Sequence, residues 1–437
     1  MPLAPHATLD DPTPPSPTPV SPGVGIEREA AGRGISWRRN LYAITAAQFL
    51  AIVGFSLREP ILPFYLKELG AASTDDATRF AGYFGAAGGL TMAVSAPIWG
   101  AVGDRFGRKP MLIRSTLAAT MTVGLMGFAT DAWHIVGLRL VEGAFTGTVT
   151  AATVLVATTA PRDKLGFNLG MVQTAVFAGA AFGPALGGVT AGAVGYRATF
   201  WVSAAMLFAA MLVVVLLVKE VFGRDERATS RAARAGESRS ERWGWMRSPV
   251  MLSMLGVLFM VRFAQQGTRP VMPLYLQELG GYADDRAASL SGWMFGAAGV
   301  ASAASAISFG RRGDRVGHRR VLLWSTAGAG ALYLPLALVR SPWQLVALQA
   351  VFGVAAGGLI PAANAIVAQV TASDRRGVTF GVTAMAGAVG AAVGPLLLSS
   401  AIAPAFGFGA SFLVVAVLTL GLTAYLWRAL ERLPAGT

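Results

Sequence analysis

The chain repeats one short motif at an interval of 210 residues. Residues 100–109 read GAVGDRFGRK, and residues 310–319 read GRRGDRVGHR. The same offset relates PILPFYL at 60–66 to PVMPLYL at 270–276. Because the matching motifs recur in the same order, we infer that a unit of about 200 residues has been duplicated. A fold for this chain must therefore contain two related halves.

Both copies are apolar over most of their length. The chain is 54% hydrophobic and only 14% charged, which is unusual for a soluble protein. Twelve segments reach the length of about 20 residues that crosses the hydrocarbon core of a bilayer. They are residues 41–66, 79–102, 110–130, 133–159, 166–191, 197–218, 250–276, 288–309, 321–339, 343–369, 380–402 and 407–427. The sequence predicts an all-α integral membrane protein with twelve transmembrane helices in two six-helix, pseudo-symmetric halves.

Polar stretches divide the chain into domains. Residues 1–36 are rich in Pro and contain no apolar run, so they indicate a disordered tail rather than a signal peptide. Residues 219–247 carry many charges and separate the two halves as a linker. We therefore expect the six-helix halves at 37–218 and 248–430, and a short tail at 431–437.

Basic residues are concentrated in the two tails, the linker and the loops on the same side of the predicted helices. This asymmetry predicts that both termini and the linker are cytoplasmic. The excess of Arg (32) over Lys (4) suggests a bacterial coding sequence, so the expected location is the cytoplasmic membrane of a bacterium. The asymmetry also accounts for the net charge of +13, so nucleic-acid binding is not indicated. The chain has no Cys and three scattered His, so neither a metal site nor a thiol nucleophile is expected.

Residues 100–109 resemble the signature loop of the major facilitator superfamily, and residues 310–319 resemble its second copy. The resemblance covers about residues 37–430. It implies the major facilitator fold, and a loop that locks and releases the cytoplasmic helix ends during alternating access. The implied gating residues are Gly100, Asp104, Arg105, Gly107, Arg108 and Lys109, with Asp314 and Arg315 in the second copy. The structural alternative is a basic hairpin with turn glycines.

The fifth apolar segment contains GAAFGPALGG at 179–188, which is similar to the motif that marks antiporters in this superfamily. Gly179, Gly183 and Gly187 share one helix face, and Pro184 removes a backbone hydrogen bond, so a close and bent helix contact is expected. Gly188 completes the motif. The resemblance implies export, whereas ordinary packing of small residues is the alternative.

Two charges in the fourth segment extend the resemblance. Arg139 and Glu142 match the family's Arg-x-x-Gln-Gly motif, with Glu in place of the usual Gln. The family associates this motif with proton coupling. A local ion pair between side chains three residues apart is the structural alternative.

The first and seventh segments carry further charges. Arg58 and Glu59 follow a charge-free run, and Arg269 lies 210 residues after Glu59. The family packs helices 1, 4, 7 and 10 around a central cavity, so these residues could meet the fourth-segment charges there, together with Arg262. A carboxylate beside an Arg can alternate between ion-paired and protonated forms, as a proton-driven exchanger requires. The alternative is a fixed salt bridge of Glu59 with Arg58 or Arg269 at the membrane rim.

Substrate contacts are expected from polar and aromatic side chains on the cavity helices. Ligand pockets are mostly apolar with a few placed polar groups. The candidates that fit this pattern are Gln48, Phe55, Gln265, Gln266, Gln349, Phe352 and Asn364. Packing inside the halves is the alternative for each of them.

Together these features predict a proton-coupled antiporter that exports small, lipophilic or drug-like molecules and resembles bacterial multidrug efflux proteins. Protonation of Glu59 or Glu142 from outside is expected to weaken a pair with Arg139 or Arg269 and to make the inward-facing state accessible. The proton gradient supplies the energy, so no cofactor and no catalytic residue are expected. The expected partners are substrate, protons and the bilayer, with a monomer as the functional unit. The alternative is an importer or a narrow-specificity metabolite transporter on the same fold.

Overall fold

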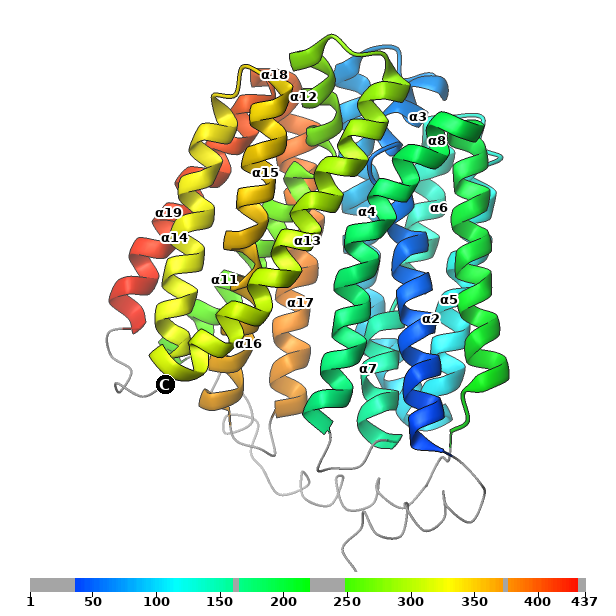
Figure 1. The fold of residues 1–437 in the computed structure, drawn as a ribbon, viewed down its shortest axis with the longest axis vertical. Coiled ribbons are helices and arrows are strands. Elements are labelled where there is room, and N and C mark those ends of the chain that lie inside the picture. The colour runs from blue at the N-terminus through cyan, green and yellow to red at the C-terminus, as the bar shows by residue number, and fades with distance from the viewer. Residues whose placement is uncertain (1–35, 160–164, 221–247, 372–375, 431–437) are drawn as a thin grey trace, which may run out of the picture.

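The computed structural model describes residues 36–159, 165–220, 248–371 and 376–430, and these residues are almost entirely helical (Figure 1). Residues 1–35 of the predicted N-terminal tail, the predicted tail at 431–437 and most of the predicted linker at 219–247 lie outside this part of the chain. The proposed domain bounds therefore stay predictions.

The first half consists of seven assigned helices. They are α2 (Trp37–Leu57), α3 (Leu62–Glu68), α4 (Thr74–Phe106), α5 (Arg108–Met126), α6 (Ala132–Ala144), α7 (Thr148–Thr159) and α8 (Leu165–Leu217). In α8, Gly195 has a φ of 82°, which is accessible to glycine at little cost, and the chain reverses direction there. The helix α8 therefore crosses the bundle twice (Figure 1).

The second half follows the same order with more interruptions. It contains α11 (Pro249–Thr268), α12 (Val271–Gly280), α13 (Asp284–Val316), α14 (His318–Ala337), α15 (Pro342–Gly357), α16 (Leu359–Val370), α17 (Arg376–Gly394), the π-helix η3 (Pro395–Ile402), α18 (Ala403–Phe406) and α19 (Phe408–Leu430). Equivalent helices break at equivalent places. For example, α2 and α3 form one crossing in the first half, and α11 and α12 form one in the second.

In the described part of the chain, nine helical stretches are long and apolar enough to cross a membrane. One of them, Phe167–Leu217, is 51 residues long and holds the two crossings of α8. The helices α5 and α14 are the crossings that this criterion leaves out. The fold therefore has the twelve transmembrane helices in two pseudo-symmetric halves that the sequence predicts.

Two ends of the bundle can be distinguished. We call the end at which α8 ends and α11 begins the linker end, and α2 starts and α19 finishes there as well (Figure 1). The opposite end, which carries α3, α12 and α18, is called the distal end (Figure 1).

The stretch 100–109 is not the loop that the sequence suggests. The helix α4 continues to Phe106 and α5 begins at Arg108, so only Gly107 separates them. Gly107 has a φ of 98°, and Gly317 repeats this junction with a φ of 91°. A single glycine in this conformation is enough to reverse the chain between two helices, because it carries no Cβ.

The N-terminus of α5 is capped by a residue that lies at the end of the first half in the sequence. The carboxylate of Glu220, just after α8, accepts hydrogen bonds from the backbone N–H groups of Arg108 (2.7 Å) and Lys109 (2.8 Å). An acidic cap satisfies free N–H groups and complements the helix dipole. This contact holds the signature segment against the last residues before the linker.

The glycines of the fifth-segment motif make two kinds of contact. Gly179, Gly183 and Gly187 face α2, where a Cβ at Gly187 would overlap the carbonyl of Leu57. Gly188 instead faces α13 of the other half, where a Cβ would lie 2.8 Å from the Cα of Ser289. The motif therefore packs α8 both within its half and across the interface between the halves.

The contact at Gly187 predicts a specific loss of stability. Gly187→Ala should lower the melting temperature of the purified protein in detergent, because overpacking costs about 1–3 kcal/mol. Gly192→Ala is the matched control, since no atom lies within 4 Å of a Cβ built there. Equal melting temperatures for the two variants would contradict the packing described for α2 and α8.

Candidate functional site

Three charged residues form a buried cluster inside the first half. Arg58 donates two hydrogen bonds to Glu142, at 2.7 and 2.6 Å, and Arg139 donates one to the same carboxylate at 2.5 Å. The side chains of Arg58 and Glu142 are only 6% and 3% exposed. Glu142 is thus held by two guanidinium groups, and we call Arg58, Arg139 and Glu142 the buried cluster.

Local structure places the buried cluster. Arg58 caps the end of α2, where Pro60 follows in the break before α3. The ring of Phe84 on α4 lies under both guanidinium groups, at 5.4 Å from Arg58 and 4.9 Å from Arg139. Arg139 also occupies the space beside Gly88, where a Cβ would collide with its guanidinium. The two cations are therefore stabilised by an aromatic face as well as by one carboxylate.

A second ion pair joins the two halves. Arg269, at the end of α11, donates a 2.6 Å hydrogen bond to Glu59, at the end of α2. Glu59 and Arg269 are equivalent positions in the duplication, so the pair lies where the two halves meet. The side chains are 24% and 39% exposed, respectively. We call Glu59 and Arg269 the distal pair.

Further contacts close the distal end. Lys67 donates a hydrogen bond to Gln277 at 2.8 Å and lies 3.4 Å from Asp284 in an ion pair. Lys67 and Gln277 are again related by the 210-residue offset, a signal that sequence reasoning overlooked. Ser400 of η3 donates to the carbonyl of Arg79 on α4 at 3.1 Å. At this end the two halves are therefore held together by side chains as well as by glycine packing.

Nearer the linker end, α11 presents an Arg-containing face to the first half. By helical spacing, Leu255, Arg262, Gln266 and Arg269 share one face of α11. The neighbouring face, at Phe263, packs on α17. Since Arg269 contacts Glu59 of the first half, this face of α11 is directed at the first half. Arg262 is nevertheless exposed. The space between the halves thus extends at least to Arg262.

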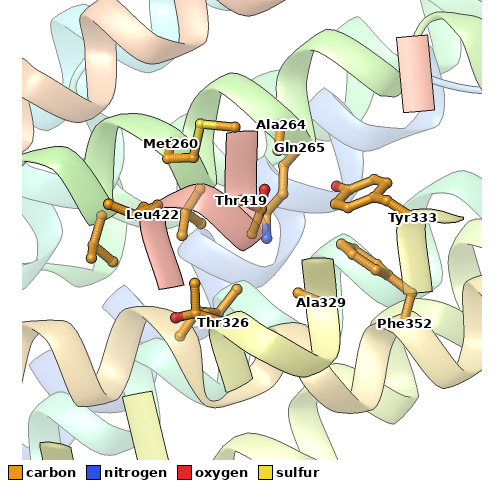
Figure 2. A pocket seen from close by; sticks show the side chains of 12 residues that line it. Met260, Ala264, Gln265, Thr326, Ala329, Tyr333, Phe352, Thr419 and Leu422 are labelled. Atoms are coloured by element: carbon orange, nitrogen blue, oxygen red, sulfur yellow. The ribbon is translucent and has the colours of Figure 1, made fainter. Parts of the chain in front are cut away.

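Two of the predicted substrate residues line a small cavity inside the second half rather than the space between the halves. Gln265 and Phe352 border a cavity of about 20 Å³ inside the second half, together with Tyr333 and Thr419 (Figure 2). The rings of Phe352 and Tyr333 lie 4.8 Å apart. Figure 2 shows the Gln265 amide directed into this cavity. A cavity of this size accommodates about one water molecule rather than a drug-sized ligand.

The other candidates for substrate contact are spread over α2, α11, α15 and α16. Phe55 is half-buried, with the Arg58 guanidinium 5.7 Å from its ring centroid. Gln48 is buried and its Nε2 has no hydrogen-bond partner among the described residues. Gln266, Gln349 and Asn364 are partly exposed. The structure therefore does not gather the seven candidates into one pocket.

The gating residues are only partly described. Arg105 and Arg315 are exposed at the linker end, whereas the side chains of Asp104 and Asp314 lie outside the described part of the chain. Sequence reasoning missed Glu220, which caps α5 from 112 residues away. No local pattern could have indicated that contact, because it depends on how α8 returns to the linker end.

Comparison with known proteins identifies the family. The sequence profile of the Major Facilitator Superfamily matches residues 44–283, which include most of the first half, and again residues 254–437, which include most of the second. The chain therefore belongs to the major facilitator superfamily. Within it, the chain is similar to Multidrug resistance protein MdtG of Serratia proteamaculans, with 32% identity over 401 residues, 92% of this chain and 96% of that protein. It is 33% identical over 399 residues to MdtG of Escherichia fergusonii, covering 91% and 96%.

Solved structures share the fold at low sequence identity. The human organic anion transporter MFSD10 (TETRAN) matches with a TM-score of 0.67 and 20% identity, covering 89% of this chain and 99% of that one. A bacterial homologue of the human lysosomal transporter Spinster, in an inward-facing and occupied conformation, matches with a TM-score of 0.71 and 14% identity, covering 90% and 96%. These matches agree with the two-half architecture.

The buried cluster predicts that Glu142 is important for stability. Glu142→Gln leaves the buried Arg58 guanidinium and the partly buried Arg139 guanidinium without a carboxylate, and breaking a buried pair typically costs about 3–5 kcal/mol. The variant should show a clearly lower melting temperature and poorer recovery in detergent. Glu278→Gln, at an exposed position, should behave as wild type. A Glu142→Gln protein as stable as this control would show that the cluster is not a structural requirement.

Proposed function

We propose that the protein is a proton-coupled antiporter that exports small, lipophilic or drug-like molecules across the bacterial cytoplasmic membrane. The observation that carries this proposal is the distal pair, an ion pair between the halves that contains a titratable carboxylate. It lies at the closed end of an interface that is open as far as Arg262. The multidrug resistance names of the MdtG relatives support the substrate class.

In this proposal the linker end faces the cytoplasm. Basic side chains gather at that end, among them Arg105 in the last turn of α4 and Arg108 and Lys109 at the start of α5, as the positive-inside tendency favours. The state described here is then open to the cytoplasm and closed to the outside. The monomer, with both halves in one chain, is the proposed functional unit, and its partners are substrate, protons and the bilayer.

The direction of coupling differs from the sequence-based expectation. Because the distal pair closes the outer end, ionised Glu59 stabilises the inward-open state rather than hindering it. Protonation of Glu59 removes one charge of the pair and favours outward opening. A carrier with neither proton nor substrate therefore stays closed to the outside. Antiport requires this, because an empty carrier that changed state freely would let the proton and the substrate cross independently.

The energies involved are compatible with this role. A partly exposed ion pair contributes about 1 kcal/mol or less. A proton that crosses the full membrane potential supplies about 2.3 kcal/mol per 100 mV. One proton is therefore enough to shift the equilibrium at the distal pair. Glu142, which is fixed by two guanidinium groups, is better suited to positioning Arg58 and Arg139 than to exchanging protons.

Dye efflux tests the proposal. Cells of a pump-deficient bacterium are loaded with the neutral dye Nile red while de-energised, and efflux is followed after re-energisation with and without a protonophore. Wild type and the exposed-site control Glu278→Gln should show protonophore-sensitive efflux. Glu59→Gln should reduce that efflux at least about tenfold at equal expression, because the Gln amide cannot alternate between a protonated and an ionised form.

Two results would contradict the proposal in different ways. Efflux by Glu59→Gln at the wild-type rate would place proton coupling elsewhere. A wild-type protein that moves no dye would favour a narrow-specificity transporter or an importer on the same fold.

A further inference from the structure

Arg262 differs from the other arginines near the interface. Arg58 and Arg139 share Glu142, and Arg269 pairs with Glu59. In the part of the chain that the structure describes, Arg262 has neither an ion pair nor a hydrogen bond. An unpaired Arg in the middle of a transmembrane helix is costly in lipid, so it marks a water-filled or ligand-binding position.

The position of Arg262 is defined by its helix. It lies seven residues before Arg269 on the same face of α11, about 10 Å closer to the linker end at 1.5 Å per residue. Its Cγ lies near α17, where a Cβ at Gly387 would be 3.3 Å away, yet Arg262 as a whole is exposed. Because this face of α11 is directed at the first half, we infer that the guanidinium group lies in the space between the halves.

The fold itself does not require a cation at this depth. The equivalent residue in the first half is Ile52, which packs against Gly179 of α8. In the first half, an apolar side chain therefore occupies the equivalent helix position. The distal pair, the buried cluster and Arg262 together comprise four guanidinium groups and two carboxylates. Their sum is two more positive than negative charges.

We propose that Arg262 is a specificity-determining residue that binds the anionic head group of an amphipathic substrate, such as a carboxylate or sulfonate attached to an apolar body. Its guanidinium group supplies paired donors for such a head group. Phe259, one turn nearer the linker end and stacked on Phe263 at 5.9 Å between ring centroids, offers an apolar surface for the body. This proposal rests on the proposed function in one respect, that the space between the halves is the substrate path.

Binding of three probes with one apolar body tests the proposal. The probes are 1-pyrenebutyrate (anionic), pyrenebutanol (neutral) and pyrenebutyl-trimethylammonium (cationic). Affinities are measured on the purified full chain in phosphatidylcholine nanodiscs, with empty nanodiscs subtracted. Wild type should bind the anion at least about tenfold more tightly than the cation.

The variants separate recognition from folding. Arg262→Gln and Arg262→Met should each weaken the anion about tenfold and the neutral probe less than twofold, while Arg262→Lys should keep most of the preference. Arg286→Gln removes an exposed arginine beside Tyr282 and should leave all three affinities unchanged. The methionine variant keeps an apolar stem, so that at least one neutral variant is expected to fold.

Three results would overturn the proposal. They are a wild type that binds none of the probes, a wild type that does not prefer the anion, and neutral variants in which all three affinities fall equally. Because binding is measured without a gradient, such a failure leaves proton-coupled export standing. Conversely, wild-type efflux rates for Glu59→Gln would contradict the coupling proposal without affecting anion recognition at Arg262.

Discussion

The cost of placing a charge inside a membrane governs the arrangement of this interface. Each guanidinium group within the bundle must find a carboxylate, an aromatic face or water. Arg58 and Arg139 find Glu142 and the ring of Phe84, and Arg269 finds Glu59 in the other half. The last of these pairs is the one that depends on how the halves are oriented, so it links the charge state of one carboxylate to the shape of the whole protein.

Duplication explains why the interface pairs lie where they do. Residues at equivalent positions meet across the pseudo-twofold relation of the halves, as Glu59 meets Arg269 and Lys67 meets Gln277. If the residues at such positions were identical, two like charges would repel each other and two neutral side chains would form no ion pair. Divergence of the two copies has therefore produced complementary contacts at the distal end. The same divergence leaves Arg262 opposite no equivalent charge, since its counterpart is Ile52.

The fold could be predicted largely from the repeat and the apolar segments, because lipid leaves helices as the main way to satisfy the backbone. The local pair of Arg139 and Glu142 could also be predicted from spacing. The partner of Arg58 could not. Arg58 and Glu59 are adjacent in sequence, yet Arg58 contacts Glu142 inside the first half and Glu59 contacts Arg269 of the second half. Which side chain points where depends on how the chain turns at the break between α2 and α3. The cap by Glu220 depends likewise on tertiary packing.

The most direct test measures the distance across the distal end. The chain contains no Cys, so spin labels can be placed at exposed Ala72 and Ala283 by Cys substitution without removing native thiols. Pulsed electron–electron double resonance in nanodiscs at pH 8 and pH 5 then compares the distance between the labels in wild type and in Glu59→Gln. The account predicts that Glu59→Gln at pH 8 shows the longer distances that wild type shows at pH 5. A Glu59→Gln distribution identical to that of wild type at pH 8 would contradict it.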